Sequence, residues 1–231
     1  MASDSLISLS NITFAYSGGR TVFEDFSFTF RAGQRIGLVG SNGSGKTTLL
    51  QLIMGLLKPA QGTIELFGKQ CHTEKDFREA RLKTGFVFQD ANDQLFCPTV
   101  GDDLAFGPLN MGKTREEADQ IVDETLQRLQ LEAFKERVTY GLSDGEKKLV
   151  AIGTALAMKP AMLILDEPTT CLDEEACERI ADVLLKCGLP YLVVAHDRGF
   201  LDKVTTNRIM LKDGRIIDAP AAACCRPPDQ A

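Results

Sequence analysis

The stretch GSNGSGKT, residues 40–47, has the spacing of a loop that binds phosphate groups. It matches G-x-x-x-x-G-K-[ST] between a strand pattern and a helix pattern, which is the context that the motif requires. Its glycines let backbone amides approach oxygen atoms, and a helix N-terminus adds a positive dipole. We expect Lys46 to contact the β- and γ-phosphates of a nucleotide and the Thr47 hydroxyl to bind Mg²⁺. The alternative is a glycine-rich turn that fits by chance. The predicted contacts are Gly40, Ser41, Asn42, Gly43, Ser44, Gly45, Lys46, Thr47 and Thr48.

Two adjacent carboxylates end the apolar run AMLILDEP, residues 161–168. Only one of them can point along the strand toward the nucleotide, so we expect them to have different roles. Asp166 is predicted to hold the Mg²⁺ shell, and Glu167 to polarise a water for attack on the γ-phosphate. The alternative is an exposed strand end that caps the next turn.

Polar residues also end two other apolar strand patterns, GFVFQ at residues 85–89 and VVAHD at residues 193–197. Ligands bind at the carboxyl ends of parallel strands in such sheets. We therefore expect His196 to sense the γ-phosphate, and Gln89 to contact the attacking water or complete the Mg²⁺ coordination. A lone histidine is otherwise more often structural.

The surrounding patterns predict the fold that positions these residues. Alternating Phe26, Phe28 and Phe30 indicate a half-buried strand of antiparallel type in the first thirty residues. A strand at 35–39, a helix at 46–57 and strands at 63–67 and 85–89 follow, and a helix begins at Thr114. The second half alternates a helix at 144–158, a strand at 162–165, a helix at 173–187, a strand at 191–195, a helix from Arg198 and a hairpin at 208–217. This alternation predicts an α/β fold with a mostly parallel sheet, an antiparallel β lobe and a helical lobe inserted at about residues 90–160.

Composition limits the remaining possibilities. The 231 residues carry a net charge of −6, which does not suggest a nucleic-acid surface. No run of 18 apolar residues and no secretory signal pattern is present, so we expect a cytosolic protein that does not itself span the membrane. Seven cysteines without C-x-x-C spacing predict free thiols. We expect one domain at residues 1–218 and a disordered tail at 219–231, where Cys224 and Cys225 are either idle or able to capture a metal.

The stretch YGLSDGEKKLV, residues 140–150, places Ser143 three residues before Glu146, which predicts a capping box at a helix start. In this order, the phosphate loop, Gln89, LSDGE, LILDEP, CLD at 171–173 and His196 resemble the P-loop ATPases of the ATP-binding cassette type, from Leu6 to about Ile217. The family signature is usually LSGGQ. This chain departs from it at Asp144 and Glu146.

The resemblance implies a head-to-tail dimer with a second cassette subunit, identical or related, in which each ATP lies between two chains. Ser143 and the Gly145 amide would contact the partner's γ-phosphate, and Asp173 would reach across the interface. Tyr16 matches the aromatic residue that stacks on adenine in relatives, although packing in the β lobe is a competing explanation. A carboxylate about 6 Å from a phosphate charge would cost about 3 kcal/mol at an effective dielectric of 20, so we expect Asp144 to point to solvent or to a basic group such as Lys147 or Lys148.

A narrower resemblance, in residues 86–112, is to the ATPases of energy-coupling-factor importers. It implies an ATP-hydrolysing subunit at the cytoplasmic face of the membrane, bound to an integral membrane subunit, that drives import of cobalt, nickel or a vitamin. Apolar residues here suit a docking surface, although core packing could explain several of them: Leu95, Phe96, Val100, Leu104 and Phe106. The alternative function is a nucleotide-responsive regulatory module with weak ATPase activity. No residue identifies the cargo.

Overall fold

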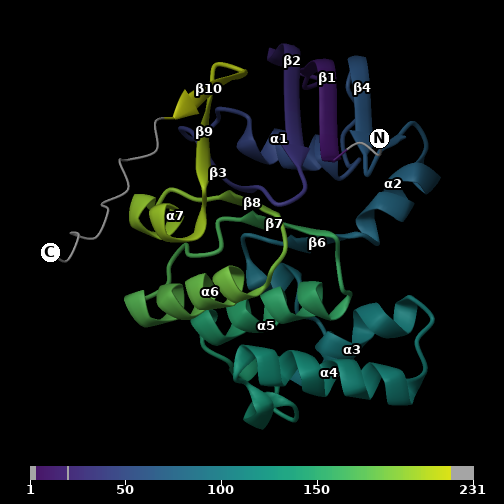
Figure 1. Cartoon of the computed structure of the whole chain (residues 1–231), viewed down its shortest axis with the longest axis vertical. Helices are drawn as coiled ribbons and strands as arrows, with labels where there is room; N and C mark the ends of the chain where they lie inside the picture. The colour runs from purple at the N-terminus through teal and green to yellow at the C-terminus, as the bar shows by residue number, and fades with distance from the viewer. Residues whose placement is uncertain (1–3, 20, 220–231) are drawn as a thin grey trace, which may run out of the picture.

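The computed structural model describes residues 4–19 and 21–219, and it contains two β-sheets with helices beside and below them (Figure 1). The predicted tail, with Cys224 and Cys225, lies outside the described residues except for Ala219, which ends the last strand. The five cysteines within the described part are free thiols, as predicted. No helix in this part is long and apolar enough to cross a membrane.

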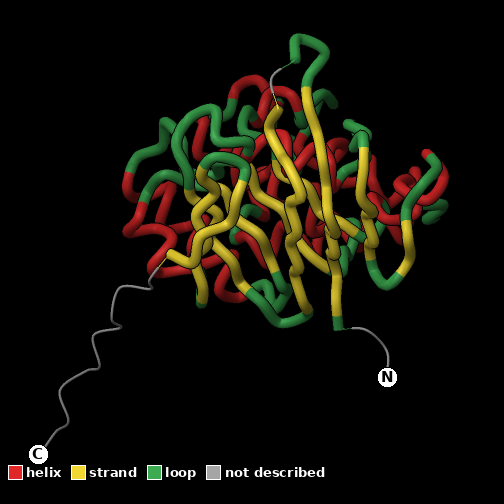
Figure 2. Tube along the Cα trace, turned by 90° about the horizontal axis from the view of Figure 1, so that it is seen from above, coloured by secondary structure: helices red, strands yellow, loops and turns green. Residues whose placement is uncertain are grey.

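The first sheet is antiparallel and has the strand order β2-β1-β4-β5. Its strands are β1 (Ser5–Ala15), β2 (Thr21–Arg31), β4 (Gln61–Leu66) and β5 (Lys69–Gln70). The predicted alternation is present, because Phe26, Phe28 and Phe30 are buried and their neighbours on β2 are more exposed. Seen from above, β1 and β2 are long neighbouring strands (Figure 2). Helix α2 (Glu74–Arg81) follows this sheet.

The second sheet has the strand order β10-β9-β3-β8-β7-β6. Its parallel strands are β3 (Arg35–Val39), β6 (Thr84–Val87), β7 (Met162–Asp166), β8 (Tyr191–Val194) and β9 (Asn207–Lys212). The edge strand β10 (Arg215–Ala219) pairs antiparallel with β9. Asp213 and Gly214 join them with positive φ angles of 49° and 70°, the signs that a two-residue type I′ hairpin turn requires. The predicted hairpin is therefore confirmed.

The parallel sheet separates two hydrophobic cores. Along β7, Met162 and Ile164 face the core shared with the antiparallel sheet, and Leu163 and Leu165 face the core shared with the helices below. Helix α1 (Lys46–Ile53) contributes its apolar side to the upper core. A strand buried on both faces explains why β7 is an unbroken apolar run.

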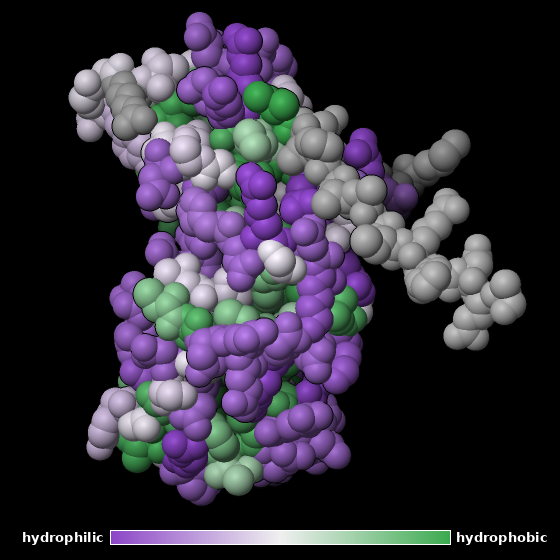
Figure 3. Space-filling model, turned by 90° about the vertical axis from the view of Figure 1, so that its left-hand side faces the viewer, coloured by the Kyte–Doolittle hydropathy of each residue, from purple (hydrophilic) through white to green (hydrophobic). Residues whose placement is uncertain are grey.

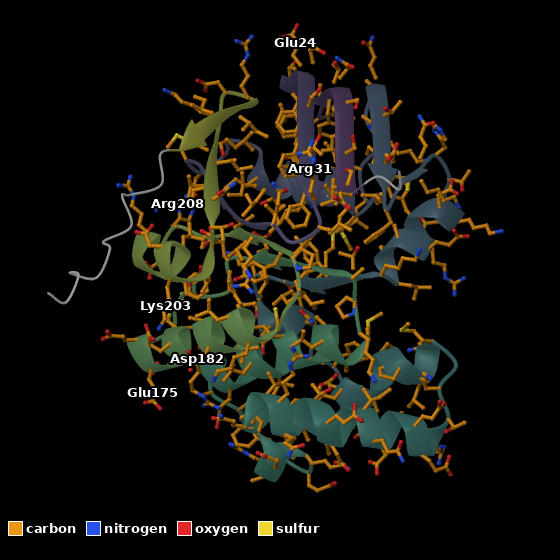
Figure 4. The ribbon with its side chains drawn as sticks, viewed as in Figure 1. Glu24, Arg31, Glu175, Asp182, Lys203 and Arg208 are labelled. Atoms are coloured by element: carbon orange, nitrogen blue, oxygen red, sulfur yellow. The ribbon has the colours of Figure 1, made fainter. Side chains whose placement is uncertain are left out.

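Helices α3 (Val100–Asn110), α4 (Arg115–Leu129) and α5 (Asp144–Ala157) lie below the parallel sheet in Figure 1. Short 3₁₀ turns occupy Ala91–Asp93, Glu132–Phe134 and Thr139–Gly141. Helix α6 (Glu174–Lys186) and helix α7 (Arg198–Val204) cover the same side of the sheet. Lys203 of α7 forms an ion pair with Glu178 of α6, and in Figure 4 Lys203 lies beside the α6 residue Asp182. The face seen in Figure 3 is mainly hydrophilic.

The predicted fold class is confirmed, with local corrections. The helix expected at 46–57 stops at Ile53, because Gly55 takes a left-handed conformation (φ +70°) under the ring of Phe77. Gln89 lies two residues beyond the end of β6 rather than on it. Helices α2 and α3 were not predicted as separate elements. The domain limits at residues 1–218 stay a prediction.

Candidate nucleotide-binding site

Four neighbouring strands, β3, β8, β7 and β6, end at one edge of the parallel sheet, and a cavity of about 440 Å³ lies there. Most of the residues that the sequence singled out line this cavity, although they come from widely separated parts of the chain. These are Tyr16, Asn42, Gly43, Gly45, Lys46, Thr47, Thr48, Gln89, Asp166, Glu167 and His196. Val22 and Thr170 also line it and were not predicted, because neither residue type carries a recognisable chemical signal.

The phosphate loop is shaped by close packing. A Cβ atom on Gly40 would lie 2.5 Å from the Leu211 carbonyl oxygen, so only glycine fits. Gly45 has a φ angle of +106°, which side chains disfavour. The Lys46 ammonium donates to the carbonyls of Gly40 at 2.7 Å and Ser41 at 3.3 Å, so the loop wraps around the amine. Ser41 and Ser44 line a separate hollow beside the β9–β10 turn rather than the cavity itself.

The two carboxylates take different directions because the strand ends between them. Asp166 is the last residue of β7, whereas Glu167 has a φ angle of +46° and its amide donates to the Val194 carbonyl at 2.8 Å. The Thr170 hydroxyl donates to Glu167 Oε2 at 3.2 Å, and His196 Nε2 lies 3.2 Å from Oε1. A left-handed non-glycine residue costs about 1–3 kcal/mol, and such strained residues cluster at functional sites. The turn therefore holds Glu167, a residue that is only 8% exposed, at the cavity wall.

The charges of the site act on one another. Burial raises the pKa of Asp166, and the negative charge of Glu167 raises it further. Burial lowers the pKa of Lys46, while Glu167 and Asp166 oppose that shift. A divalent cation would relieve the repulsion between the carboxylates. Thr47, Gln89 and Asp166 all line the cavity, and side chains of these types carry oxygen donors that suit Mg²⁺.

Tyr16 follows β1 and reaches the cavity from the antiparallel sheet. Its ring packs edge to face on Phe14 with centroids 5.0 Å apart, and its hydroxyl lies 3.0 Å from Thr48 Oγ1. Phe14 is buried, but Tyr16 remains 42% exposed. Packing in the β lobe does not explain why Tyr16 is exposed, whereas a ring that stacks on a base must be accessible.

The residues of the signature LSDGE do not line the nucleotide cavity. Ser143, Gly145 and Asp173 line a different pocket of about 410 Å³, together with Cys171. The predicted capping box is confirmed, because the Ser143 hydroxyl accepts from the Glu146 amide at 3.3 Å and Glu146 Oε2 accepts from the Ser143 amide at 2.7 Å. Arg137 also pairs with Glu146 Oε1 at 2.8 Å. Glu146 is thus used within its own chain.

Two other residues complete this pocket. A Cβ on Gly145 would lie 2.7 Å from the Cβ of Ala176, so packing of α5 against α6 requires glycine. Asp173 caps α6 by accepting from the Ala176 amide at 2.8 Å. Asp144 is exposed and lines both the signature pocket and a hollow that also contains Lys147 and Lys148, so its expected direction stays a prediction. Its charge opposes the lowering of the Lys148 pKa, which is caused mainly by burial.

The fold and this cavity define a P-loop ATPase. The family model described as "ABC transporter" matches residues 23–170, and the chain belongs to the ABC transporter family of ATP-binding cassettes. It is therefore an ATP-binding, ATP-hydrolysing cassette subunit of a transporter.

The chain is similar to curated relatives over nearly its whole length. It is 44% identical to a Brucella suis protein named as an ABC transporter ATP-binding protein, with 93% of this chain and 89% of the relative covered. It is 37% identical to the energy-coupling factor transporter ATP-binding protein EcfA of Methanothermobacter thermautotrophicus (92% and 70% covered). It is also 37% identical to the cobalt import ATP-binding protein CbiO of Rhodobacter capsulatus (92% and 77% covered).

Solved structures of ATP-binding cassettes are similar to this chain as well. CbiO1 of Clostridium perfringens, described as part of the ABC transporter complex CbiONQ, superimposes with a TM-score of 0.85 at 34% identity, covering 93% of this chain and 87% of that chain. A dimeric ATP-binding cassette in a post-hydrolysis state, bound to ADP and Pi, gives a TM-score of 0.82 at 28% identity, covering 94% and 99%. Both comparisons extend well beyond the phosphate loop.

Proposed function

We propose that this chain hydrolyses ATP to drive an importer of the energy-coupling-factor type, whose cargo is cobalt, nickel or a vitamin. The observation that carries the ATPase part is the single cavity that joins the phosphate loop to Asp166, Glu167, Gln89 and His196. The names of the EcfA and CbiO relatives support the importer class. We further propose that the chain works at the cytoplasmic face of the membrane.

In this proposal each residue has a role that its position allows. Lys46 and the loop amides bind the β- and γ-phosphates, and Tyr16 stacks on the adenine. Thr47, Asp166 and Gln89 hold Mg²⁺, which when bound offsets the negative charge of the phosphates. Glu167 orients the attacking water and accepts its proton. His196, whose Nε2 lies 3.2 Å from Glu167 Oε1, contacts the γ-phosphate.

The position of the signature supports a shared site. Ser143, Gly145 and Asp173 line a pocket of their own rather than the nucleotide cavity, so a second cassette subunit would have to bring its signature to this chain's ATP. The Ser143 hydroxyl accepts a hydrogen bond within its capping box, and its proton can still be donated. It can therefore contact a phosphate oxygen without breaking the helix cap. The similar solved cassette bound to ADP and Pi is a dimer, which supports the presence of a second subunit.

The apolar residues near Gln89 fall into two groups. Val100 and Leu104 are fully buried, and Leu95 packs against the same core. Phe96 and Phe106 are 64% and 47% exposed, and their rings meet edge to face with centroids 4.7 Å apart. Core packing therefore explains the first group but not the second. We propose that Phe96 and Phe106 dock the membrane subunit.

Replacing both Phe96 and Phe106 by serine is expected to abolish co-purification with the integral membrane subunit of the importer, because exposed aromatic rings dominate such contacts. The ATPase rate of the isolated chain should stay within about twofold, since neither ring lines the cavity. The matched control is Leu56→Ser, a 65% exposed apolar residue after α1. Retained co-purification with cargo-stimulated ATPase activity in the reconstituted complex would exclude this docking surface.

The altered signature favours an alternative, a regulatory module with weak ATPase activity, if Asp144 repels the partner's phosphates. Asp144→Asn removes the charge and keeps the size. Because Asp144 is exposed and shares a hollow with Lys147 and Lys148, we expect ATP-driven dimerisation to change by less than about threefold. Sedimentation with and without ATP measures this. Tightening by about 100-fold, the scale of a 3 kcal/mol repulsion, would instead make Asp144 a brake and favour the alternative.

A further inference from the structure

Lys148 is a buried amine whose hydrogen bonds go to backbone carbonyls. The residue is 3% exposed and lies in α5, five residues after Ser143. Its ammonium donates to the carbonyl of Phe88 at 3.1 Å and to that of Gln89 at 2.5 Å. Burying an ammonium group is costly unless its hydrogen bonds are made, and an apolar side chain would fill the same space without that cost. The carboxylates of Asp90, Asp166 and Asp144 partly offset the burial of its charge, but its hydrogen bonds go to the Phe88 and Gln89 peptides.

Further contacts attach the same segment to the same helix. Gln94 donates through Nε2 to the Ala151 carbonyl and to the Thr154 hydroxyl, both at 2.8 Å, and its Oε1 accepts from the Phe88 amide at 3.1 Å. Lys147 donates to Asn92 Oδ1 at 2.9 Å. Residues 88–94 are therefore bonded to α5 at both ends, whereas β6, from which they leave, belongs to the parallel sheet.

We propose that Lys148 is a positioning residue for ATP hydrolysis, which fixes the Gln89 backbone to the signature helix and so sets where the Gln89 side chain enters the nucleotide cavity. The inference rests on the role proposed for Gln89. Since α5 begins at the signature, a displacement of Ser143 and Gly145 carries Gln89 with it. The chain's own signature, which faces a partner, is in this way connected to the chain's own Mg²⁺-binding residues.

The test compares Lys148→Met with Lys147→Met, a neighbouring lysine whose bond goes to the Asn92 side chain instead of the Gln89 backbone. In Lys148→Met we expect kcat to fall by about tenfold or more, with the Kd for ATP in EDTA within about twofold of the parent. Mg²⁺ is expected to tighten ATP binding. The Mg²⁺ concentration that gives half of this tightening should be about threefold higher or more in Lys148→Met than in the parent. Lys147→Met should leave all three quantities within about twofold. Lys148→Gln, which keeps amide donors on a shorter side chain, should be intermediate and serves if Lys148→Met does not fold.

Amide hydrogen exchange gives a readout that does not depend on activity. Lys148→Met should speed exchange about tenfold in peptides covering residues 88–95 and leave residues 191–204 unchanged. Uniformly faster exchange with a loss of ATP affinity would mean general destabilisation and would overturn the inference. So would a kcat within twofold of the parent. Gln89→Ala separates the two proposals: if it does not lower kcat, the role of Gln89 fails, and if it does while Lys148→Met does not, only the positioning role fails.

Discussion

Substitution of Glu167 by glutamine is expected to lower the ATP turnover number by about 10²- to 10⁴-fold, the usual contribution of a positioned general base. The amide has the size of the carboxylate and can still accept from the Thr170 hydroxyl, which lies 3.2 Å from Glu167 Oε2. It cannot take a proton from water. ATP binding should therefore remain, and hydrolysis should not follow. Steady-state phosphate release and ATP binding, measured on the same preparation, separate the two effects.

Retained ATP also predicts a change in assembly. If hydrolysis opens the dimer, the Glu167→Gln protein should elute as a dimer in the presence of ATP and Mg²⁺ and as a monomer without them. The matched control is Glu132→Gln, an exposed carboxylate in the helical region whose loss should change neither property. An unchanged ATPase rate would remove Glu167 from the role of base. His196, whose Nε2 lies 3.2 Å from Oε1, would then be the residue to substitute next.

The sequence predicted the parts of this site that depend on local patterns and strand order. Gly40 to Thr48 form a contiguous motif, Asp166 ends an apolar strand, and His196 lies two residues after another. Because the carboxyl ends of neighbouring parallel strands share one edge, recognising the strands was enough to bring these residues together. The capping box at Ser143 and Glu146 was readable for the same reason, since it depends on a spacing of three residues.

Long-range contacts were not readable in this way. Lys148 looks like one of several charges on a helix face, and only the fold brings its amine to carbonyls 59 and 60 residues earlier. Glu167 has a left-handed backbone that directs its carboxylate. The sequence does not reveal this conformation, because the position is not a glycine. Helix α3 contains Gly101, Gly107 and Pro108, a composition typical of loops, and it forms because Thr99 caps it and Val100 and Leu104 are buried.

Lys46→Ala is expected to weaken ATP binding by at least about 10- to 150-fold, which corresponds to the 1.5–3 kcal/mol that a hydrogen bond to a charged group contributes. The amine also holds the loop through the carbonyls of Gly40 and Ser41, so its loss removes both the charge and part of the shape that receives the phosphates. Titration calorimetry with ATP in EDTA measures the effect without hydrolysis. Lys58→Ala, an exposed lysine after α1, is the control. An ATP affinity within twofold of the parent would contradict the assignment of the loop.

The two substitutions act at successive steps, so their combination is informative. Glu167→Gln alone should accumulate an ATP-dependent dimer, because the variant still binds ATP but cannot open the dimer by hydrolysing it. Lys46→Ala alone should leave the chain monomeric, because nucleotide binding precedes closure. The double variant should therefore behave as Lys46→Ala does at ATP concentrations that saturate the parent, and it should recover the dimer only when ATP is raised by the factor that calorimetry gives for Lys46→Ala. A double variant that dimerises at the ATP concentration of the single Glu167→Gln protein would mean that closure does not depend on the grip of Lys46 on the phosphates.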